Sequence, residues 1–290
     1  MVKLRLVRHS RTAKGRRSRS RRDTPARFVP DAFAVSLSHV TAIGDGGSLV
    51  LLRHGQSVSN AADVFTGWSD PPLSALGVTQ ARQAARTLRE IGVRPTSVHT
   101  SLLRRSIATA EIIADALGRG WLPVQRSWRL NERHYGALTG RDKRAVAAES
   151  GAETFRDWRR SYAIAPPAMA DTDAAALYAD ARYADLPPDA RPRTESLADV
   201  RVRTLPYWAD VLRPLVLAGG TPLVVGHGNS LRAFVMHLEG IGAADVERLD
   251  IPTAVPMRYR LDRRGRPVTG PEGRYLDPVS AREQVRVGPP

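Results

Sequence analysis

The sequence predicts an α/β fold, a three-layer sandwich in which a mostly parallel central sheet is flanked by helices. Short apolar runs bounded by glycines are typical of strands that are buried on both faces of a parallel sheet. Segments with helical periodicity separate these runs, so strands and helices alternate along the chain. With 290 residues, of which 42% are hydrophobic, the chain is long enough for a large domain with a full core.

The first expected strand covers residues 49–52, directly after a glycine-rich segment. A helix is expected over residues 74–91, because Ser74 is a good N-cap residue and apolar residues recur on one face of the segment. Residues 98–100 are a second candidate strand. Residues 102–117 then repeat the helical pattern and end before a glycine, which is a common C-terminal signal.

The second half of the chain continues the alternation. Residues 223–225 form another short apolar run, and a helix is expected from Asn229 onward. The stretch from Pro166 to Arg193 is rich in Ala, Pro and Asp and has weak periodicity, so we expect a surface excursion there.

Composition excludes several classes of protein. There are no cysteines, which excludes disulfides, thiolate metal sites and a thiol nucleophile and favours a reducing compartment. No apolar run reaches the roughly 18 to 20 residues that a membrane span needs. The net charge of +15 is concentrated in residues 1–47, which hold eleven Lys or Arg against three Asp. Lys143 is the only lysine after that segment, where arginine is otherwise the cation in use.

Residues 1–47 are expected to form a disordered basic extension, because residues 5–27 are rich in Arg and Ser and lack apolar periodicity. A dispensable tail or an upstream start-codon error is the simplest explanation. Two alternatives stay open: an export signal around Arg21-Arg22, and an arm that binds RNA.

Two histidines follow buried strands at the edge where parallel sheets form ligand sites. His54 lies between Arg53 and Gly55 after the first strand, and His227 lies between two glycines after the strand at 223–225. Both could be packed core histidines, but their shared placement favours a common site. The similar Arg8-His9-Ser10 lacks the glycine and the folded surroundings, so we treat it as a chance match.

Arginine near these histidines points to phosphoryl chemistry. Arg105 is expected in the first turn of a helix, where it could face the same anion as Arg53. A neutral imidazole between arginines can attack phosphorus and become a phosphohistidine. A metal site at the two histidines would need a third ligand clustered with them at a suitable spacing, and the sequence offers none, so no metal is expected.

Seven sequence blocks between residues 49 and 275 resemble the cofactor-dependent phosphoglycerate mutases of the histidine phosphatase superfamily. They are Leu52-Arg53-His54-Gly55-Gln56-Ser57, Phe65-Thr66-Gly67-Trp68, Leu73-Ser74, Leu130-Asn131-Glu132-Arg133-His134-Tyr135-Gly136, Trp158-Arg159-Arg160, Thr194-Glu195-Ser196-Leu197 and His227-Gly228-Asn229-Ser230-Leu231-Arg232. The resemblance implies a phosphoglycerate mutase-like catalytic domain at residues 48–277, with a short tail at 278–290.

The resemblance also implies roles for individual residues. His54 would be the phosphorylated nucleophile, and Glu132 would donate and accept the proton. The transferring phosphoryl group would be held by Arg53, Asn60, Arg105 and His227. Substrate would be bound by Thr66, Gly67, Arg133, His134, Tyr135, Lys143, Arg159, Arg160, Gly228 and Asn229.

The implied activity is the glycolytic and gluconeogenic interconversion of 3-phosphoglycerate and 2-phosphoglycerate, primed by 2,3-bisphosphoglycerate. The resemblance further implies a cytoplasmic homo-oligomer, a dimer or a tetramer, that has no membrane partner and does not use nucleic acid. Two alternatives remain: a histidine phosphatase acting on a small phosphoester, and a non-catalytic protein that binds nucleic acid through residues 1–47.

Three departures from the family pattern bear on activity. Gln56 stands where the family usually has Glu, which removes a charge beside the nucleophile. Residues 174–178 lack the His and Pro often found there. Residues 275–278 replace the usual turn before a tail that covers the site in the family, so exclusion of water is the property most in question.

Overall fold

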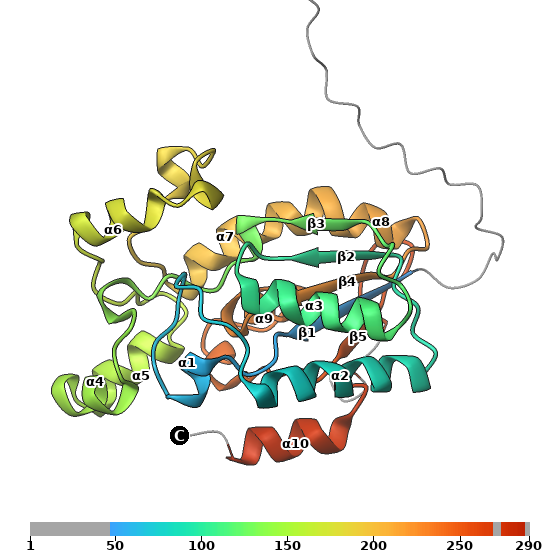
Figure 1. Cartoon of the computed structure of the whole chain (residues 1–290), viewed down its shortest axis with the longest axis horizontal. Coiled ribbons are helices and arrows are strands. Elements are labelled where there is room, and N and C mark those ends of the chain that lie inside the picture. The colour runs from blue at the N-terminus through green and yellow to red at the C-terminus, as the bar shows by residue number, and fades with distance from the viewer. Residues whose placement is uncertain (1–46, 269–273, 288–290) are drawn as a thin grey trace, which may run out of the picture. The chain divides into compact units, whose positions relative to one another are not determined.

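The computed structural model describes residues 47–268 and 274–287. The expectations about residues 1–46 fall outside this part of the chain. The centre of the fold is a five-stranded sheet in the order β3-β2-β4-β1-β5 (Figure 1). The strands are β1 (Ser48–Arg53), β2 (Ser97–Thr100), β3 (Val124–Arg126), β4 (Pro222–Gly226) and β5 (Met257–Arg260). All neighbours pair in parallel except β5, which runs antiparallel to β1.

Helices cover both faces of the sheet, so the predicted three-layer architecture is confirmed. Side chains of β1 alternate between two cores: Leu49 and Leu51 pack with α7 (Leu197–Tyr207) and α9 (Gly228–Glu239). Val50 and Leu52 pack on the other face with α2 (Ala75–Glu90) and α3 (Arg104–Ala116). Burial on both faces explains why this strand is a continuous apolar run rather than an alternating one.

The predicted elements agree with the structure to within a few residues. Ser74 caps α2 by accepting a hydrogen bond from the Gly77 amide, as its position before the apolar pattern indicated. The helix expected from residue 102 begins at Arg104, because Leu103 is still extended. The sequence patterns did not predict β3 or β5, nor the helices α1 (Val58–Ala61), α4 (Lys143–Ser150), α5 (Ala152–Arg160), α6 (Asp171–Tyr178), α7 (Leu197–Tyr207), α8 (Arg213–Leu217) and α10 (Pro278–Val287).

Short irregular helices complete the described part of the chain. A π-helical segment, Trp208–Leu212, continues α7 into α8. Five 3₁₀ turns lie at Trp128–Leu130, Gly136–Leu138, Ala181–Tyr183, Pro188–Ala190 and Val246–Arg248. Figure 1 shows α4, α5 and α6 beyond the carboxyl ends of the parallel strands, where the sequence places the candidate site.

The stretch at residues 166–193 is more ordered than the expected surface excursion. It contains α6 and two 3₁₀ turns, and Tyr183 is fully buried. The ring of Tyr183 stacks on Trp68 with centroids 5.2 Å apart, and Leu186 and Ala190 complete a small apolar cluster. Most of the segment is nevertheless exposed, as expected of a surface excursion, and these few aromatic contacts, not a helical stripe, hold it in place.

Gly47 is already part of the fold. Its amide donates to the Val216 carbonyl, and its carbonyl accepts from the Leu261 amide. Among the described residues, the strand partners of β1 lie between residues 222 and 260. We therefore expect removal of residues 1–46 to leave the melting temperature and the turnover unchanged, whereas removal of residues 1–48 should lower the melting temperature. Thermal unfolding and activity assays of both truncations check this, and an insoluble or inactive protein starting at Gly47 would refute it.

His99 lies inside the core between two hydroxyl groups. Its Nε2 is 2.9 Å from Ser97 Oγ and its Nδ1 is 2.8 Å from Tyr207 Oη. Burial lowers the pKa of His99 from 6.5 to about 4. The unfolded chain binds this proton more readily than the folded one. The contribution of His99 to the free energy of unfolding is therefore fully present above about pH 6.5 and is lost as the pH falls toward 4.

We expect His99→Gln to flatten this pH dependence. A pKa shift of this size corresponds to roughly 3 kcal/mol of unfolding free energy. The slope of the unfolding free energy against pH reports the number of protons taken up on unfolding, and between pH 6.5 and 4 this number should fall by about one in the variant. Urea unfolding at several pH values measures it. An unchanged slope would show that His99 takes up its proton as easily in the fold as in the unfolded chain.

Candidate active site

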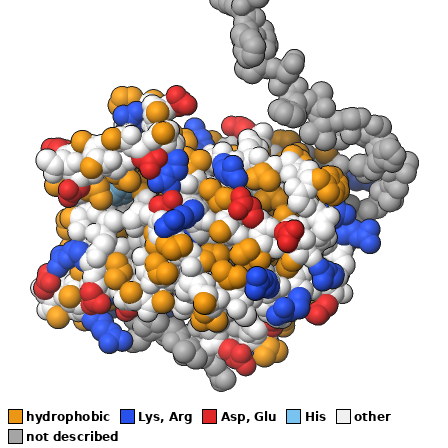
Figure 2. Space-filling model, in the orientation of Figure 1, with side chains coloured by type: hydrophobic (Ala, Val, Ile, Leu, Met, Phe, Trp, Pro, Cys, Tyr) orange, Lys and Arg blue, Asp and Glu red, His pale blue; other side chains and the backbone are white. Residues whose placement is uncertain are grey.

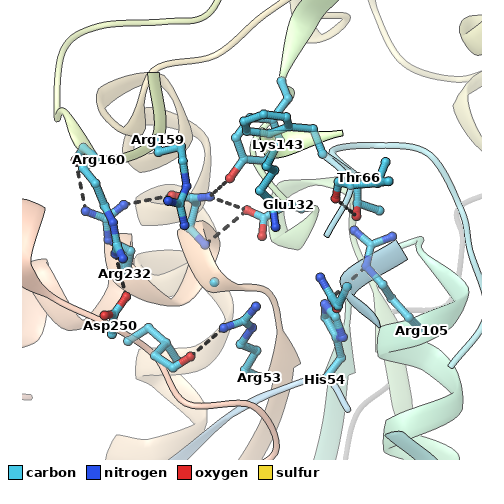
Figure 3. A pocket seen from close by; sticks show the side chains of 17 residues that line it. Arg53, His54, Thr66, Arg105, Glu132, Lys143, Arg159, Arg160, Arg232 and Asp250 are labelled. Atoms are coloured by element: carbon cyan, nitrogen blue, oxygen red, sulfur yellow. Dashed lines mark hydrogen bonds and ion pairs between the residues drawn. The ribbon is translucent and has the colours of Figure 1, made fainter. Parts of the chain in front are cut away.

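A cationic cavity of about 150 Å³ opens at the carboxyl ends of β1 and β4 (Figure 3). In a parallel sheet this edge is where ligands usually bind. Six cationic side chains line the cavity, against two carboxylates, so it suits a ligand with several negative charges. The charged lining residues are Arg53, Arg105, Lys143, Arg159, Arg160 and Arg232, with Glu132 and Asp250.

The register of the sheet brings the two strand-end histidines together. Arg53 pairs with Gly226 across β1 and β4, and the His54 amide donates to the Gly226 carbonyl at 3.0 Å. The rings of His54 and His227 consequently lie edge to face with centroids 4.9 Å apart. Both are buried, at 3% and 0% exposure. The structure therefore places the two strand-end histidines side by side, as expected from their positions after neighbouring strands.

Hydrogen bonds define which nitrogen of His54 can react. Arg105 Nε donates to His54 Nε2 at 3.2 Å, so Nε2 must carry the lone pair. Nδ1 lies 2.6 Å from the Gly55 carbonyl and therefore carries the proton. Burial, followed by the positive charges of Arg105 and Arg53, lowers the pKa of His54 well below its usual value. The ring is thus neutral at neutral pH and its Nε2 is unprotonated, as a nucleophile requires.

Close backbone packing fixes the turn that carries His54. A Cβ on Gly55 would lie 2.3 Å from the Gly77 carbonyl oxygen, and a Cβ on Gly77 would lie 2.0 Å from the Gln56 carbonyl oxygen. Only glycine at both positions lets the turn after β1 approach the start of α2 this closely. The Gly55 amide also donates to Thr109 Oγ1 on α3. His54 is therefore carried by a rigid support.

Arg105 and Arg53 are held in place by backbone carbonyls. Arg105 is 1% exposed, and its two terminal nitrogens donate to the carbonyls of Ser69 and Gly67 at 2.8 and 2.9 Å. Burial lowers the pKa of Arg105 to about 10, so it stays charged at neutral pH. Arg53 donates to the Ile251 carbonyl at 2.9 Å, while its buried Nε has no partner among the described residues. Both guanidinium groups flank His54 (Figure 3).

His227 precedes the first turn of α9. Its Nε2 is 2.8 Å from Ser101 Oγ, and its buried Nδ1 has no partner in the described part of the chain. Burial and the charges of Arg105 and Arg53 lower the pKa of His227 well below its usual value. The N-terminal amides of α9 follow directly, which adds a favourable dipole for an anion at this position.

Glu132 extends into the cavity from the loop after the 3₁₀ turn at Trp128–Leu130. Its Oε1 accepts three hydrogen bonds: from the Arg133 amide at 2.7 Å, the Asn229 amide at 3.1 Å and Asn229 Nδ2 at 3.0 Å. Asn229 Nδ2 also contacts Tyr135 Oη at 3.1 Å. These contacts connect the carboxylate to the first turn of α9 and hold it in the middle of the cavity (Figure 3).

The far wall of the cavity comes from α4 and α5. Lys143, the first residue of α4, forms a 2.6 Å ion pair with Asp63, whose backbone has a φ of 55°. Arg159 and Arg160 end α5, where cations favour the helix terminus. Arg160 forms a 2.5 Å ion pair with Asp250. This wall supplies positive charge away from His54.

The sequence profile of the histidine phosphatase superfamily, branch 1, matches residues 49–179 and 169–270, which is most of the chain. The chain belongs to the histidine phosphatase superfamily. It is 53% identical over 234 residues to the 2,3-bisphosphoglycerate-dependent phosphoglycerate mutase of Clavibacter sepedonicus, covering 81% of this chain and 92% of the relative. The mutase of the same name from Thermobifida fusca is 52% identical over 239 residues, with 82% and 96% covered. The resemblance to the mutases of this superfamily is thereby confirmed.

Solved structures share the fold of this chain. A mycobacterial glucosyl-3-phosphoglycerate phosphatase superposes with a TM-score of 0.57 at 27% identity, covering 73% of this chain and 92% of that one. Bacillus stearothermophilus YhfR superposes with a TM-score of 0.60 at 22% identity, covering 79% and 97%. The predicted phosphoglycerate mutase-like fold is therefore confirmed.

Most residues that the resemblance to the superfamily assigned to the site line the cavity. They are Arg53, His54, Asn60, Thr66, Arg105, Glu132, Tyr135, Lys143, Arg159, Arg160, Gly228 and Asn229. His227 does not line it but lies against His54. The sequence reasoning gave no role to Arg232 and Asp250, which do line it. Arg232 is four residues after Gly228, the first residue of α9. Residues four apart lie on the same face of a helix, so this spacing could have indicated that Arg232 faces the site.

Gly67, Arg133 and His134 do not line the cavity, in contrast to their expected contact with substrate. The Gly67 carbonyl instead orients Arg105. Arg133 is fully buried and donates to the carbonyls of Trp158 and Arg159. His134 is fully buried, and its Nδ1 accepts from the Gly136 amide. Arg133 and His134 turn inward to backbone partners, which are carbonyls at the end of α5 for Arg133 and the Gly136 amide for His134.

Neither a metal site nor a membrane span emerges from the described residues. Nowhere within them do three or more His, Cys, Asp or Glu side chains cluster as metal ligands would. None of the helices they form is both long and apolar enough to span a bilayer.

Proposed function

We propose that this chain interconverts 3-phosphoglycerate and 2-phosphoglycerate through phospho-His54, in glycolysis and gluconeogenesis. The observation that carries the proposal is the neutral His54, whose Nε2 lone pair faces the Arg105 guanidinium inside a cationic cavity that also holds Glu132. Relatives that share about half of the sequence are named as mutases of this type, which supports the same assignment.

The site fits 2,3-bisphosphoglycerate as the priming phosphoryl donor. Two buried nitrogens beside the nucleophile, Arg53 Nε and His227 Nδ1, have no partner among the described residues, as expected where an anion completes the site. Lys143, Arg159 and Arg160 provide a second cluster of charge on the far wall. When bound, this donor supplies the first phosphoryl group to His54.

The geometry suits an in-line phosphoryl transfer. His54 Nε2 uses its lone pair to form the N–P bond while the bond between phosphorus and the substrate oxygen breaks. Arg53, Arg105 and the first turn of α9 stabilise the charge on the phosphoryl oxygens. Glu132 gives its proton to the leaving oxygen. This transfer to His54 is the second half of the cycle. In the first half, the free hydroxyl of the bound monophosphate attacks the phosphorus of phospho-His54, the N–P bond breaks, and the Glu132 carboxylate takes the hydroxyl proton. The bisphosphate formed in this way then gives the phosphoryl group on its other carbon to His54.

The cavity has two separate cationic regions, which explains how one site can catalyse the interconversion in both directions. The phosphoryl group being transferred lies among His54, Arg53 and Arg105, whereas the substrate carboxylate pairs with the wall formed by Lys143, Arg159 and Arg160. The same wall would hold the non-reacting phosphate of the priming donor. Release and rebinding of the carboxylate end would then present either hydroxyl to phospho-His54.

The remaining parts of the proposal follow the mutase assignment. The protein works on small phosphoglycerates in the cytoplasm, and it assembles as a homo-oligomer, a dimer or a tetramer. The alternative of a non-catalytic protein that binds nucleic acid through residues 1–47 rests almost entirely on residues outside the described part of the chain, and the described part gives it no added support. On the face shown in Figure 2, basic and acidic side chains are interspersed and do not form a basic stripe.

Hydrolysis is the competing fate of phospho-His54, because water could take the place of the substrate hydroxyl. The tail is the part of the sequence that raised this question. Its helix α10 is capped by Asp277, and Gln284 exchanges two hydrogen bonds with the backbone of Thr253 at 2.7 and 3.1 Å. No described residue of α10 is among those that line the cavity.

One assay separates mutase from phosphatase. Conversion of 3-phosphoglycerate should depend on trace 2,3-bisphosphoglycerate and should exceed phosphate release. We expect a measurable phosphatase side reaction, since the described tail lies outside the cavity lining. Phosphate release without conversion would overturn the proposal in favour of a histidine phosphatase.

A further inference from the structure

A buried ion pair lies behind the loop that carries Glu132. Glu195 and Arg203 are 3% and 5% exposed, and they meet through two contacts: Arg203 Nε to Glu195 Oε1 at 2.6 Å, and Arg203 Nη2 to Glu195 Oε2 at 3.0 Å. Glu195 belongs to the block Thr194-Glu195-Ser196-Leu197, which the proposed mechanism does not use. Arg203 is on α7. We call these two residues the Glu195–Arg203 pair.

The side chains of the pair make their other hydrogen bonds to one short stretch of backbone, residues 128–134. Arg203 Nη1 donates to the carbonyls of Arg129 and Asn131 at 2.8 and 3.0 Å, and Nη2 donates to the Glu132 carbonyl at 2.9 Å. Glu195 Oε2 accepts from the His134 amide at 2.8 Å. The backbone is thus held on both sides of Glu132 and at Glu132 itself.

The pair acts on the loop and not on the ligand. Neither Glu195 nor Arg203 lines the cavity, and both are too deeply buried to touch substrate. Trp68 reinforces the arrangement, because its Nε1 donates to the same Glu132 carbonyl at 2.6 Å. The Glu132 side chain is left to interact with the cavity and with Asn229.

We propose that the Glu195–Arg203 pair is a positioning device for Glu132, an inference that rests on the proposed function. A guanidinium presents its N–H groups in a rigid plane, so one side chain can fix three carbonyls and a carboxylate at once. Proton transfer needs the carboxylate within hydrogen-bond reach of the substrate oxygen, and displacements of about 1 Å can cost about 10²-fold in rate.

Stability alone does not account for the pair. Desolvation of two charges offsets much of their attraction, so a buried ion pair contributes little net stability compared with apolar packing. What the pair provides here is a fixed backbone geometry at one catalytic side chain. A lysine in place of Arg203 would keep the charge but would lose the planar set of donors.

The test compares Glu195→Gln and Arg203→Lys with a matched control, Glu239→Gln. Glu239 also forms a buried ion pair, with Arg274 at 2.6 Å and exposures of 6% and 14%, but it lies at the far end of α9. We expect the two pair variants to lower kcat by about tenfold or more while KM for 3-phosphoglycerate changes by less than about threefold. Glu239→Gln should lower the melting temperature by a similar amount without lowering kcat.

A second readout identifies Glu132 as the target. In the Glu132→Gln background, adding Glu195→Gln should change kcat by less than about twofold. The glutamine at position 132 transfers no proton, so displacing it cannot slow proton transfer further. A full additional loss in that background would overturn the inference. So would a kcat loss no larger than that of Glu239→Gln, or failure of both pair variants to fold, which would assign the pair to the fold itself.

Wild-type controls separate this inference from the proposed function. If the wild type releases phosphate but does not interconvert phosphoglycerates, the proposed function fails while the inference is still tested by phosphate release, since the leaving oxygen then also needs a proton from Glu132. A wild type without either activity overturns both. An active wild type with fully active pair variants overturns the inference alone.

Discussion

Replacing His54 with alanine should abolish mutase turnover, with a loss on the order of 10⁴-fold or more, as is typical for removal of a covalent nucleophile. It should also abolish acid-labile labelling of the protein by 2,3-bisphosphoglycerate. His54 Nε2 holds a lone pair fixed by Arg105, whereas His227 Nε2 contacts Ser101. Steady-state assays and mass spectrometry of the labelled protein measure the two effects.

His99→Gln is the matched control, because His99 is equally buried but lies outside the cavity. It should retain both turnover and labelling at neutral pH. Label found on His227, or substantial turnover in the His54 variant, would contradict the assignment of the nucleophile.

The position of His54 could be predicted because it depends on rules that operate at short range. A continuous apolar run must be buried on both faces, and the residue that follows it must emerge at the carboxyl edge of the sheet. The same rule applies to His227. Their parallel pairing places Arg53 opposite Gly226, so the proximity of the two histidines follows from two local patterns.

The missed strands lack such a local signal. β3 is three exposed residues long at the edge of the sheet, and it pairs only because β2 offers free backbone groups. β5 contains two arginines in four residues and pairs antiparallel with β1. In both cases the tertiary context, and not the propensity of the segment, decides the structure.

The supporting residues of the site were harder to predict than its reactive ones. In a chain where arginine is the common cation, nothing in the sequence distinguishes Arg203, which is buried against the Glu132 loop, from the exposed Arg248. His134 was expected to contact substrate because it stands beside Arg133 and Tyr135, yet its ring turns into the protein. Sequence patterns predict which loop reaches a site, but side-chain direction within a loop depends on distant partners.

Replacing Glu132 with glutamine should reduce mutase turnover by about 10²-fold or more, the usual scale for loss of a general acid and base. The substitution keeps the shape of the side chain. Its carbonyl oxygen can still accept from the amides of Arg133 and Asn229, as Glu132 Oε1 does. What is lost is the proton, so the effect should fall on kcat more than on KM.

The same variant should still reach near-complete labelling by 2,3-bisphosphoglycerate on long incubation. Labelling needs one transfer to His54 per molecule, whereas turnover needs a proton to be given and taken in every cycle. Chemical quench followed by mass spectrometry gives the extent of labelling, and steady-state kinetics give the turnover. Glu239→Gln serves again as the control, since it removes a buried carboxylate outside the cavity. Unchanged turnover in Glu132→Gln would show that this carboxylate is only a structural contact of α9. Equal loss of labelling and turnover would show that it acts in binding the phosphoryl donor.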